Sequence, residues 1–280
     1  MFGRDKIEYK TPEQVLLMRR AGLVVAEALA AVRERAAAGV STAQLDAVAA
    51  RVIADHHATA SFLGYHGYPA TLCVSVNDEV VHGIPGARVL EPGDVVSIDC
   101  GAIVDGWHGD SAITVVLDGA DPEDLALAET TERAMWAGIA ALSTADRLGA
   151  VGEAVEDVVD AAQSAGLNGG QRYGLVEEYV GHGIGTAMHQ PPDVPNFRTR
   201  DRGPRLRAGL CVAIEPMVVR GDRATQVLDD DWTVVTGDGS RASHWEHTVA
   251  VLDDGIWVLT APDGGAQSLG ALGVTVAPLA

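Results

Sequence analysis

Residues 94–117 read DVVSIDCGAIVDGWHGDSAITVVL, two β-rich runs on either side of the pair Asp105-Gly106. Val, Ile and Thr favour strands, and Asp-Gly favours the tight turn of a hairpin. Asp99 and Asp110 interrupt these apolar runs. A buried carboxylate is costly unless it is paired, hydrogen-bonded or bound to a metal. A hairpin that turns at Asp105-Gly106 would bring the two carboxylates together.

Along the whole chain, the predicted element order is two helices and several strands, and then two helices and several strands again. Capping boxes at Thr11–Gln14 and Ser41–Gln44 predict two helix starts, with Gly39 ending the first helix and the second reaching about His57. Two more helices are predicted over 121–142 and 151–165. Further strands are predicted over 71–76, 210–219, 226–235, 242–252 and 255–260. Strands that follow strands favour an α+β fold over a doubly wound parallel sheet.

The chain shows no linker that would divide it into two domains. We therefore expect an N-terminal segment over residues 1–11, a single catalytic domain over 12–260, and a loosely ordered tail over 261–280.

Composition narrows the class of protein. A net charge of −19 over 280 residues argues against a specific nucleic-acid partner, which would need clustered Lys and Arg. The five arginines within 198–207 are the local exception, and a solvated loop is their simplest interpretation.

No signal peptide or membrane-length apolar run is visible, so we expect a cytoplasmic protein with no membrane contact. Cys73, Cys100 and Cys211 form no C-x-x-C pair and are expected to be buried free thiols.

Two more carboxylates, Glu215 and Glu246, interrupt apolar runs near the C-terminus. Between the two pairs of acids stands Gly181-His182-Gly183-Ile184-Gly185, followed by His189. Taken singly, each acid is more often an edge or salt-bridged residue, and each histidine is more often structural. The glycines suit close backbone packing around a ligand, but the Lys and Ser or Thr of a phosphate loop are missing.

Together, four acids and a histidine make an oxygen-rich ligand set with one imidazole. Such a set suits Mn²⁺, Fe²⁺, Co²⁺ or Zn²⁺ better than Mg²⁺ or Ca²⁺. More carboxylate charge than one ion needs predicts two divalent ions, which could activate a bridging water.

These segments resemble the signatures of the type I methionine aminopeptidases of peptidase family M24. The resemblance runs from about residue 12 to 260 and rests on VNDEVVHGIPG, SIDCG, WHGDSA, GHGIG, IEPM and WEHT. It implies the α+β "pita-bread" fold, with two pseudo-symmetric halves, and removal of N-terminal methionine before a small second residue. The short interval between Glu215 and Glu246 leaves no room for the helical insertion of type II enzymes, and the short N-terminal segment lacks the zinc-binding extension of eukaryotic type I forms.

The resemblance also implies the role of each residue. The metal ligands would be Asp99, Asp110, His182, Glu215 and Glu246, with Asp110 and Glu246 bridging the ions and Asp99 on a different ion from His182 and Glu215. Glu215 would shuttle the proton of the attacking water, His189 would stabilise the scissile carbonyl, and His82 would help to protonate the leaving nitrogen.

The methionine pocket implied by the resemblance is apolar. Its walls would be Tyr65, Tyr68, Cys73, Met188 and Trp232, with Phe62 and His66 nearby. Met188 and Phe62 depart from the residues common in the family but keep the pocket apolar.

The implied partners are nascent polypeptide N-termini met by a monomer, with transient docking at the ribosome as a further option. Two alternatives remain: proline-specific relatives, which share the ligand set, and a non-enzymatic binding protein on the same fold. Proline-specific relatives usually carry an additional N-terminal domain, and a non-enzymatic relative would be expected to have lost ligands.

Overall fold

A computed structural model describes residues 6–279 of the chain. Its centre is a nine-stranded sheet in which every strand pairing is antiparallel. The order is β1-β4-β5-β14-β9-β7-β8, with β2 paired to β4 and β15 paired to β14. The strands are β1 (Thr59–Ala60), β2 (Leu72–Val76), β4 (Val95–Val104), β5 (Trp107–Val116), β7 (Gly181–Gly183), β8 (Gln190–Val194), β9 (Cys211–Ile214), β14 (Glu246–Leu252) and β15 (Gly255–Val258).

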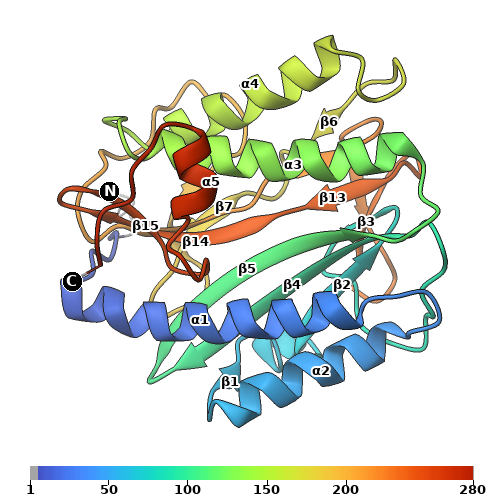
Figure 1. Cartoon of the computed structure of the whole chain (residues 1–280), viewed down its shortest axis with the longest axis horizontal. Coiled ribbons are helices and arrows are strands. Elements are labelled where there is room, and N and C mark those ends of the chain that lie inside the picture. Colours follow the sequence, from blue (N-terminus) through green and yellow to red (C-terminus); the bar gives the residue numbers. More distant parts are fainter. Residues whose placement is uncertain (1–5, 280) are drawn as a thin grey trace.

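Two pairs of helices cover one face of this sheet (Figure 1). α1 (Pro12–Arg35) packs on α2 (Thr42–Asp55), and α3 (Pro122–Ala141) packs on α4 (Ala150–Ser164). The element order therefore repeats as predicted, two helices with strands in each half, and the fold is the expected α+β pita-bread arrangement. Among residues 6–279, no helix is both long and apolar enough to cross a membrane.

The first helix begins as predicted and ends earlier than predicted. Thr11 and Gln14 form a complete capping box, with Pro12 in the first turn. The helix ends at Arg35, and Gly39 instead supplies a left-handed turn (φ 89°) between α1 and α2. α1 lies very close to the sheet: a Cβ on Gly22 would stand 2.3 Å from the carbonyl oxygen of Leu259.

The hairpin of residues 94–117 forms as predicted, with Asp105 (φ 51°) and Gly106 (φ 82°) at its turn. Asp99 pairs with Ala112, and Gly101 pairs with Asp110. Asp99 and Asp110 are thus diagonal neighbours on the same face of the sheet, because residues two apart share a face.

Three predicted single strands are each broken in two. The run 210–219 passes from the large sheet to a small sheet at Glu215-Pro216. The run 242–252 passes from the same small sheet to the large sheet at Trp245. The run 226–235 folds into a hairpin instead. The separated strands form two small sheets, β13-β10-β6 and β11-β12-β3. They comprise β3 (Glu79–Val81), β6 (Gly174–Leu175), β10 (Met217–Val219), β11 (Thr225–Val227), β12 (Val234–Thr236) and β13 (Ala242–His244).

The prediction of a loose C-terminal tail is wrong for residues 261–279. This segment contains a short helix, α5 (Ala266–Ala271), and Leu269 is fully buried in the main hydrophobic core. The run GAQSLGALG has too few apolar residues to show a helical stripe, so its one anchoring leucine gave no periodic signal.

Candidate metal centre and active site

A cavity of about 390 Å³ collects all the predicted site residues. Strands β4 and β5 of the first half contribute Asp99 and Asp110. The second half contributes His182 from β7, Glu215 from the link after β9, and Glu246 from the start of β14. The points where the predicted strands break are therefore the points that deliver Glu215 and Glu246 to the cavity.

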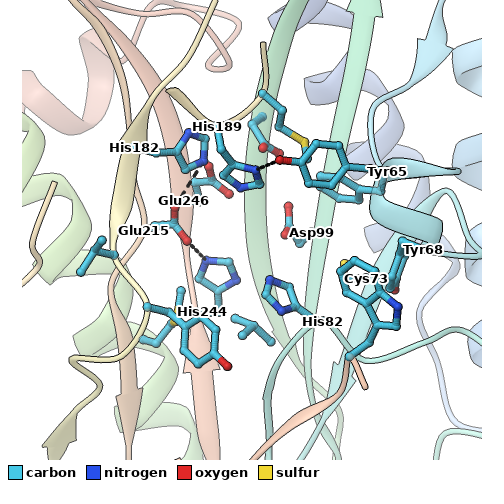
Figure 2. A pocket seen from close by; sticks show the side chains of 18 of the residues that line it. Tyr65, Tyr68, Cys73, His82, Asp99, His182, His189, Glu215, His244 and Glu246 are labelled. Carbon is cyan, nitrogen blue, oxygen red and sulfur yellow. Dashed lines mark hydrogen bonds and ion pairs between the residues drawn. The ribbon is translucent and has the colours of Figure 1, made fainter. Parts of the chain in front are cut away.

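The three residues at the centre of the cluster lie within chelating distance. One donor atom from each of Asp110, His182 and Glu246 falls within 4.8 Å of the other two. Glu215 Oε1 is 3.5 Å from His182 Nε2, and Glu215 also faces His244 (Figure 2). His182 Nδ1 lies 3.0 Å from the carbonyl oxygen of Gly183, to which it donates, so that Nε2 keeps a free lone pair directed into the cluster.

The electrostatics of the cluster call for cations. The four carboxylates have no Lys or Arg partner within the part of the chain that the structure describes. Asp110 Oδ1, Asp99 Oδ1 and Glu246 Oε1 are buried without any hydrogen-bond partner. Burial, and then the neighbouring acids, raise the pKa of Asp110 and Glu246 well above the usual range, and burial raises the pKa of Asp99 to about 7. Divalent cations bound here would satisfy these oxygens and remove the repulsion, so the residues present fit a metal centre.

The glycines around His182 serve strand packing rather than a ligand, which corrects the sequence-based interpretation. A Cβ on Gly181 would lie 2.4 Å from the carbonyl oxygen of Ala213, and one on Gly183 would lie 2.3 Å from that of Pro191. Side chains here would push β7 away from its neighbours and displace His182.

Beside the cluster the structure brings together the predicted apolar wall. The cavity is lined by Phe62, Tyr65, His66, Tyr68, Cys73, Met188 and Trp232. Tyr68 is fixed by donating to the carbonyl oxygens of Leu72 (2.9 Å) and Gly83 (3.0 Å), and its ring meets the edge of Trp232. Cys73 pairs with Asp99 across β2 and β4, so this wall directly adjoins the candidate ligands.

Two further histidines face the same cavity. His189 Nδ1 lies 2.9 Å from the hydroxyl of Tyr65 (Figure 2). His82 adopts a left-handed conformation (φ 61°) and packs its ring against Tyr179 and Trp232. Burial, and then His189, lower the pKa of His82 to about 4, so His82 is neutral at pH 7.

Sequence reasoning missed several lining residues, chiefly His244, Tyr179, Glu178 and Met217. His244 is buried, and its Nε2 stands 3.8 Å from Glu215 Oε2. Its spacing from Glu246 gives no signal, because the two residues lie in different sheets. Tyr179 and Glu178 lie in an irregular segment before β7, where the sequence has no periodicity to indicate a direction.

Comparison with known proteins agrees with this site. The chain matches the profile of metallopeptidase family M24 over residues 16–253. It is 52% identical to methionine aminopeptidase 1 of Mycobacterium tuberculosis, over 92% of this chain and 96% of that protein. The chain belongs to metallopeptidase family M24, among its type I methionine aminopeptidases.

Further comparisons show how widely the sequence and the fold are shared. Methionine aminopeptidase 1 of Bacillus subtilis is 41% identical over 90% of this chain and 98% of that protein. The crystal structure of the methionine aminopeptidase from Thermotoga maritima superposes with a TM-score of 0.86 at 36% identity, covering 91% of this chain and 99% of that one. The prolidase from Pyrococcus furiosus shares the fold (TM-score 0.66, 18% identity), but this chain, of which 90% is covered, matches only 65% of it.

These comparisons support assigning the chain to the methionine aminopeptidases rather than to the proline-specific relatives. In keeping with type I, the described chain between Glu215 and Glu246 contains only the strands β10 to β13 and no helix.

Proposed function

We propose that this M24 enzyme removes N-terminal methionine at a centre of two divalent cations, held by Asp99, Asp110, His182, Glu215 and Glu246. The observation that carries the proposal is a set of four carboxylates, two buried and two largely buried, that share one cavity with an apolar pocket and have no Lys or Arg partner in the described chain. Asp110 and Glu246 would be shared by the ions, while Asp99 would serve one ion and His182 and Glu215 the other. Co²⁺, Mn²⁺, Fe²⁺ and Zn²⁺ all suit this donor set.

Bound cations of this kind supply Lewis acidity and lower the pKa of water. Glu215 is proposed to accept the proton of the attacking water and pass it on, since its carboxylate faces the cluster. In the metal-free site, burial and then the charge of Asp99 raise the pKa of Glu215 well above its usual range, and bound cations would lower it again.

The two remaining histidines act on the scissile amide as neutral donors. If the Tyr65 hydroxyl donates to His189 Nδ1, the ring proton lies on Nε2, where it can donate to the scissile carbonyl oxygen as negative charge develops. Burial, and then His66, lower the pKa of His189, which favours this neutral form. His82 is proposed to donate to the leaving nitrogen from the opposite side.

The pocket formed by Tyr65, Tyr68, Cys73, Met188 and Trp232 is proposed to hold the methionine side chain, with Phe62 and His66 at its edge. Burial, and then Asp99, raise the pKa of the Cys73 thiol well above its usual range, so Cys73 stays neutral and packs as an apolar group. A thioether fits such a surface because sulfur contacts with aromatic rings are favourable. The proposed preference is for a small second residue.

We also propose that the enzyme acts as a cytoplasmic monomer on nascent polypeptide N-termini, with transient ribosome contact. Arg147, Arg205 and Arg207 line a second groove of about 610 Å³, and in the described chain none of them has a carboxylate within 4.0 Å. Unpaired guanidinium groups suit RNA phosphates. Salt-sensitive co-sedimentation with ribosomes, weakened in Arg205→Ala/Arg207→Ala, tests this contact.

The decisive experiment for the proposed function is hydrolysis of Met-Ala-Ser by metal-stripped protein, before and after addition of Co²⁺ or Mn²⁺. Free methionine should appear only with metal, and Asp110→Ala should abolish its release. An Ala-Pro peptide serves as the substrate control and should remain intact. Folded protein that releases no methionine with any of the four cations would exclude the proposal.

A further inference from the structure

The residues just before the first helix form a strap, defined here as residues 8–10, that lies behind the active site. The Lys10 backbone N–H donates to the carbonyl oxygen of Gly209 (2.7 Å). The side chain of Lys10 is only 1% exposed, and Nζ donates to the Glu8 carbonyl oxygen (3.1 Å) and lies 3.8 Å from Glu8 Oε2. The strap is therefore an ordered part of the enzyme.

The strap fits between two glycines. A Cβ on Gly209 would lie 2.2 Å from the Lys10 carbonyl oxygen, and a Cβ on Gly185 would lie 2.6 Å from Lys10 Cε. Gly185 is the last glycine of the sequence GHGIG, so this glycine makes room for the strap and not for a substrate or a metal ligand. The strap thus directly contacts the histidine loop, defined here as residues 184–190, which carries Met188 and His189.

Glu8 holds the histidine loop through its side chain. Glu8 Oε2 accepts from Gln190 Nε2 at 2.7 Å and from the Thr186 hydroxyl at 3.4 Å. The backbone holds the two ends of the loop, where Gln190 pairs with Gly183 and Ile184 N–H donates to the Cys211 carbonyl oxygen. Between these ends, Gly185 N–H donates to the Ala187 carbonyl oxygen, and the Gly185 carbonyl oxygen accepts from His108 N–H. Side-chain contacts from the strap therefore add restraint at Thr186 and at the side chain of Gln190.

Gln190 is the first residue of β8 and follows His189 directly. His189 lies in the bend that leads into β8, so holding the side chain of Gln190 restrains the backbone from which His189 projects into the cavity. Tyr65 holds the imidazole of His189 from the cavity side.

We propose that Glu8, oriented by Lys10, is a positioning residue that sets the placement of His189 through Gln190. This inference rests on the proposed role of His189. Displacement of a reacting group by a fraction of an ångström to about 1 Å can cost up to about a hundredfold in rate. The strap should therefore affect turnover without contributing any group to the metal centre or the pocket.

The test is a comparison of Glu8→Ala, Gln190→Ala and the double variant in metal-saturated enzyme. We expect kcat for Met-Ala-Ser to fall about tenfold in each single variant, with no further fall in the double variant, because both act through one contact. Glu8→Gln keeps an oxygen acceptor for Gln190 and should recover most of kcat. Glu34→Ala, an exposed acid near the end of α1, is the matched control and should match the wild type.

Two readouts separate positioning from general stability. Hydrogen exchange of the amides in 184–190 should accelerate in Glu8→Ala and not in Glu34→Ala, while the bound metal per chain stays unchanged. A kcat for folded Glu8→Ala within twofold of the wild type, or losses that multiply in the double variant, would overturn the inference. His189→Ala separates the proposed role of His189 from the proposed role of Glu8. If His189→Ala is impaired and Glu8→Ala is not, only the role of Glu8 is overturned. If His189→Ala is fully active, both roles are overturned.

Discussion

At the scale of single residues, the hydroxyl of Tyr65 does more than line the pocket. It is the only group in the described chain with a hydrogen bond to His189 Nδ1, and by donating to that nitrogen it would favour the tautomer that carries the proton on Nε2. Side chains that orient a functional histidine typically matter by ~10–100-fold.

Tyr65→Phe is therefore expected to lower kcat for Met-Ala-Ser by about tenfold, with a smaller effect on KM, because the ring remains in the wall. Steady-state kinetics at saturating metal provides the measurement. Tyr68→Phe is the control for loss of a tyrosine hydroxyl, since the Tyr68 hydroxyl bonds to backbone away from His189. Equal kcat losses in the two variants would contradict the proposed role of Tyr65.

The cysteines give a second residue-scale prediction. All three are buried free thiols, as predicted from their spacing. Burial raises the pKa of Cys211 to about 12 and the pKa of Cys73 and Cys100 well above the usual range. Because the thiolate is the reactive form, a thiol reagent at pH 8 should label the native protein very slowly and should count three thiols after unfolding. Rapid labelling of one thiol in the native state would show that the structure around that cysteine opens readily.

At the scale of elements, the sequence predicted what local signals encode. Capping boxes marked the starts of α1 and α2, and the Asp-Gly turn gave the register that makes Asp99 and Asp110 neighbours. The strand breaks at Glu215-Pro216 and Trp245 were not predicted, because apolar composition continues through them while the hydrogen-bond partner changes from one sheet to another. Proline lacks the N–H that a continuous ladder needs, which was the one local hint.

The same limit explains the missed His244. It lies in β13 of a small sheet, whereas Glu246 opens β14 of the large one. Their convergence on Glu215 depends on how the two sheets meet, which is a tertiary property that no spacing along the chain records.

The close approach of α1 to the sheet yields a prediction for an element. Gly22→Ala should destabilise the enzyme by roughly 1–3 kcal/mol, because its Cβ would meet the backbone of Leu259 and force the helix away. Chemical denaturation at constant metal concentration measures the change. Gly270→Ala in α5 is the control, since a Cβ there meets nothing within 4 Å, and it should be neutral or slightly stabilising. A Gly22→Ala protein as stable as the wild type would mean that α1 shifts at little cost.

At the scale of the whole molecule, the proposed metal centre joins the two halves. Asp99 and Asp110 come from the first half, whereas His182, Glu215 and Glu246 come from the second. Without cations the halves meet across four crowded carboxylates, and with cations they are cross-linked. The stability of the enzyme should therefore depend on metal and pH together.

The sign of that dependence follows from the raised pKa values. In the metal-free fold, Asp99 has a pKa of about 7, and the pKa values of Asp110, Glu215 and Glu246 are also raised well above their usual range, so the folded state binds protons that the unfolded chain has already released. A folded state that binds more protons loses stability as pH rises. Between pH 7 and 8 the buried histidines, with pKa values of about 4 for His82 and about 3 for His182, are neutral in the fold and largely neutral in the unfolded chain, and contribute little.

We therefore expect the Tm of the metal-free enzyme to fall between pH 7 and 8, and the increase in Tm on adding Mn²⁺ to be larger at pH 8. Cations compete with protons for the carboxylates, and a cation at a hundred times its Kd stabilises a fold by about 2.7 kcal/mol. For a chain of this size that corresponds to a shift of roughly 5 °C. Calorimetry with chelator and with metal at both pH values makes the comparison, with Asp110→Asn as the variant in which both effects shrink. A metal-induced shift that is equal at pH 7 and 8 would mean that the ions bind elsewhere than among these four acids.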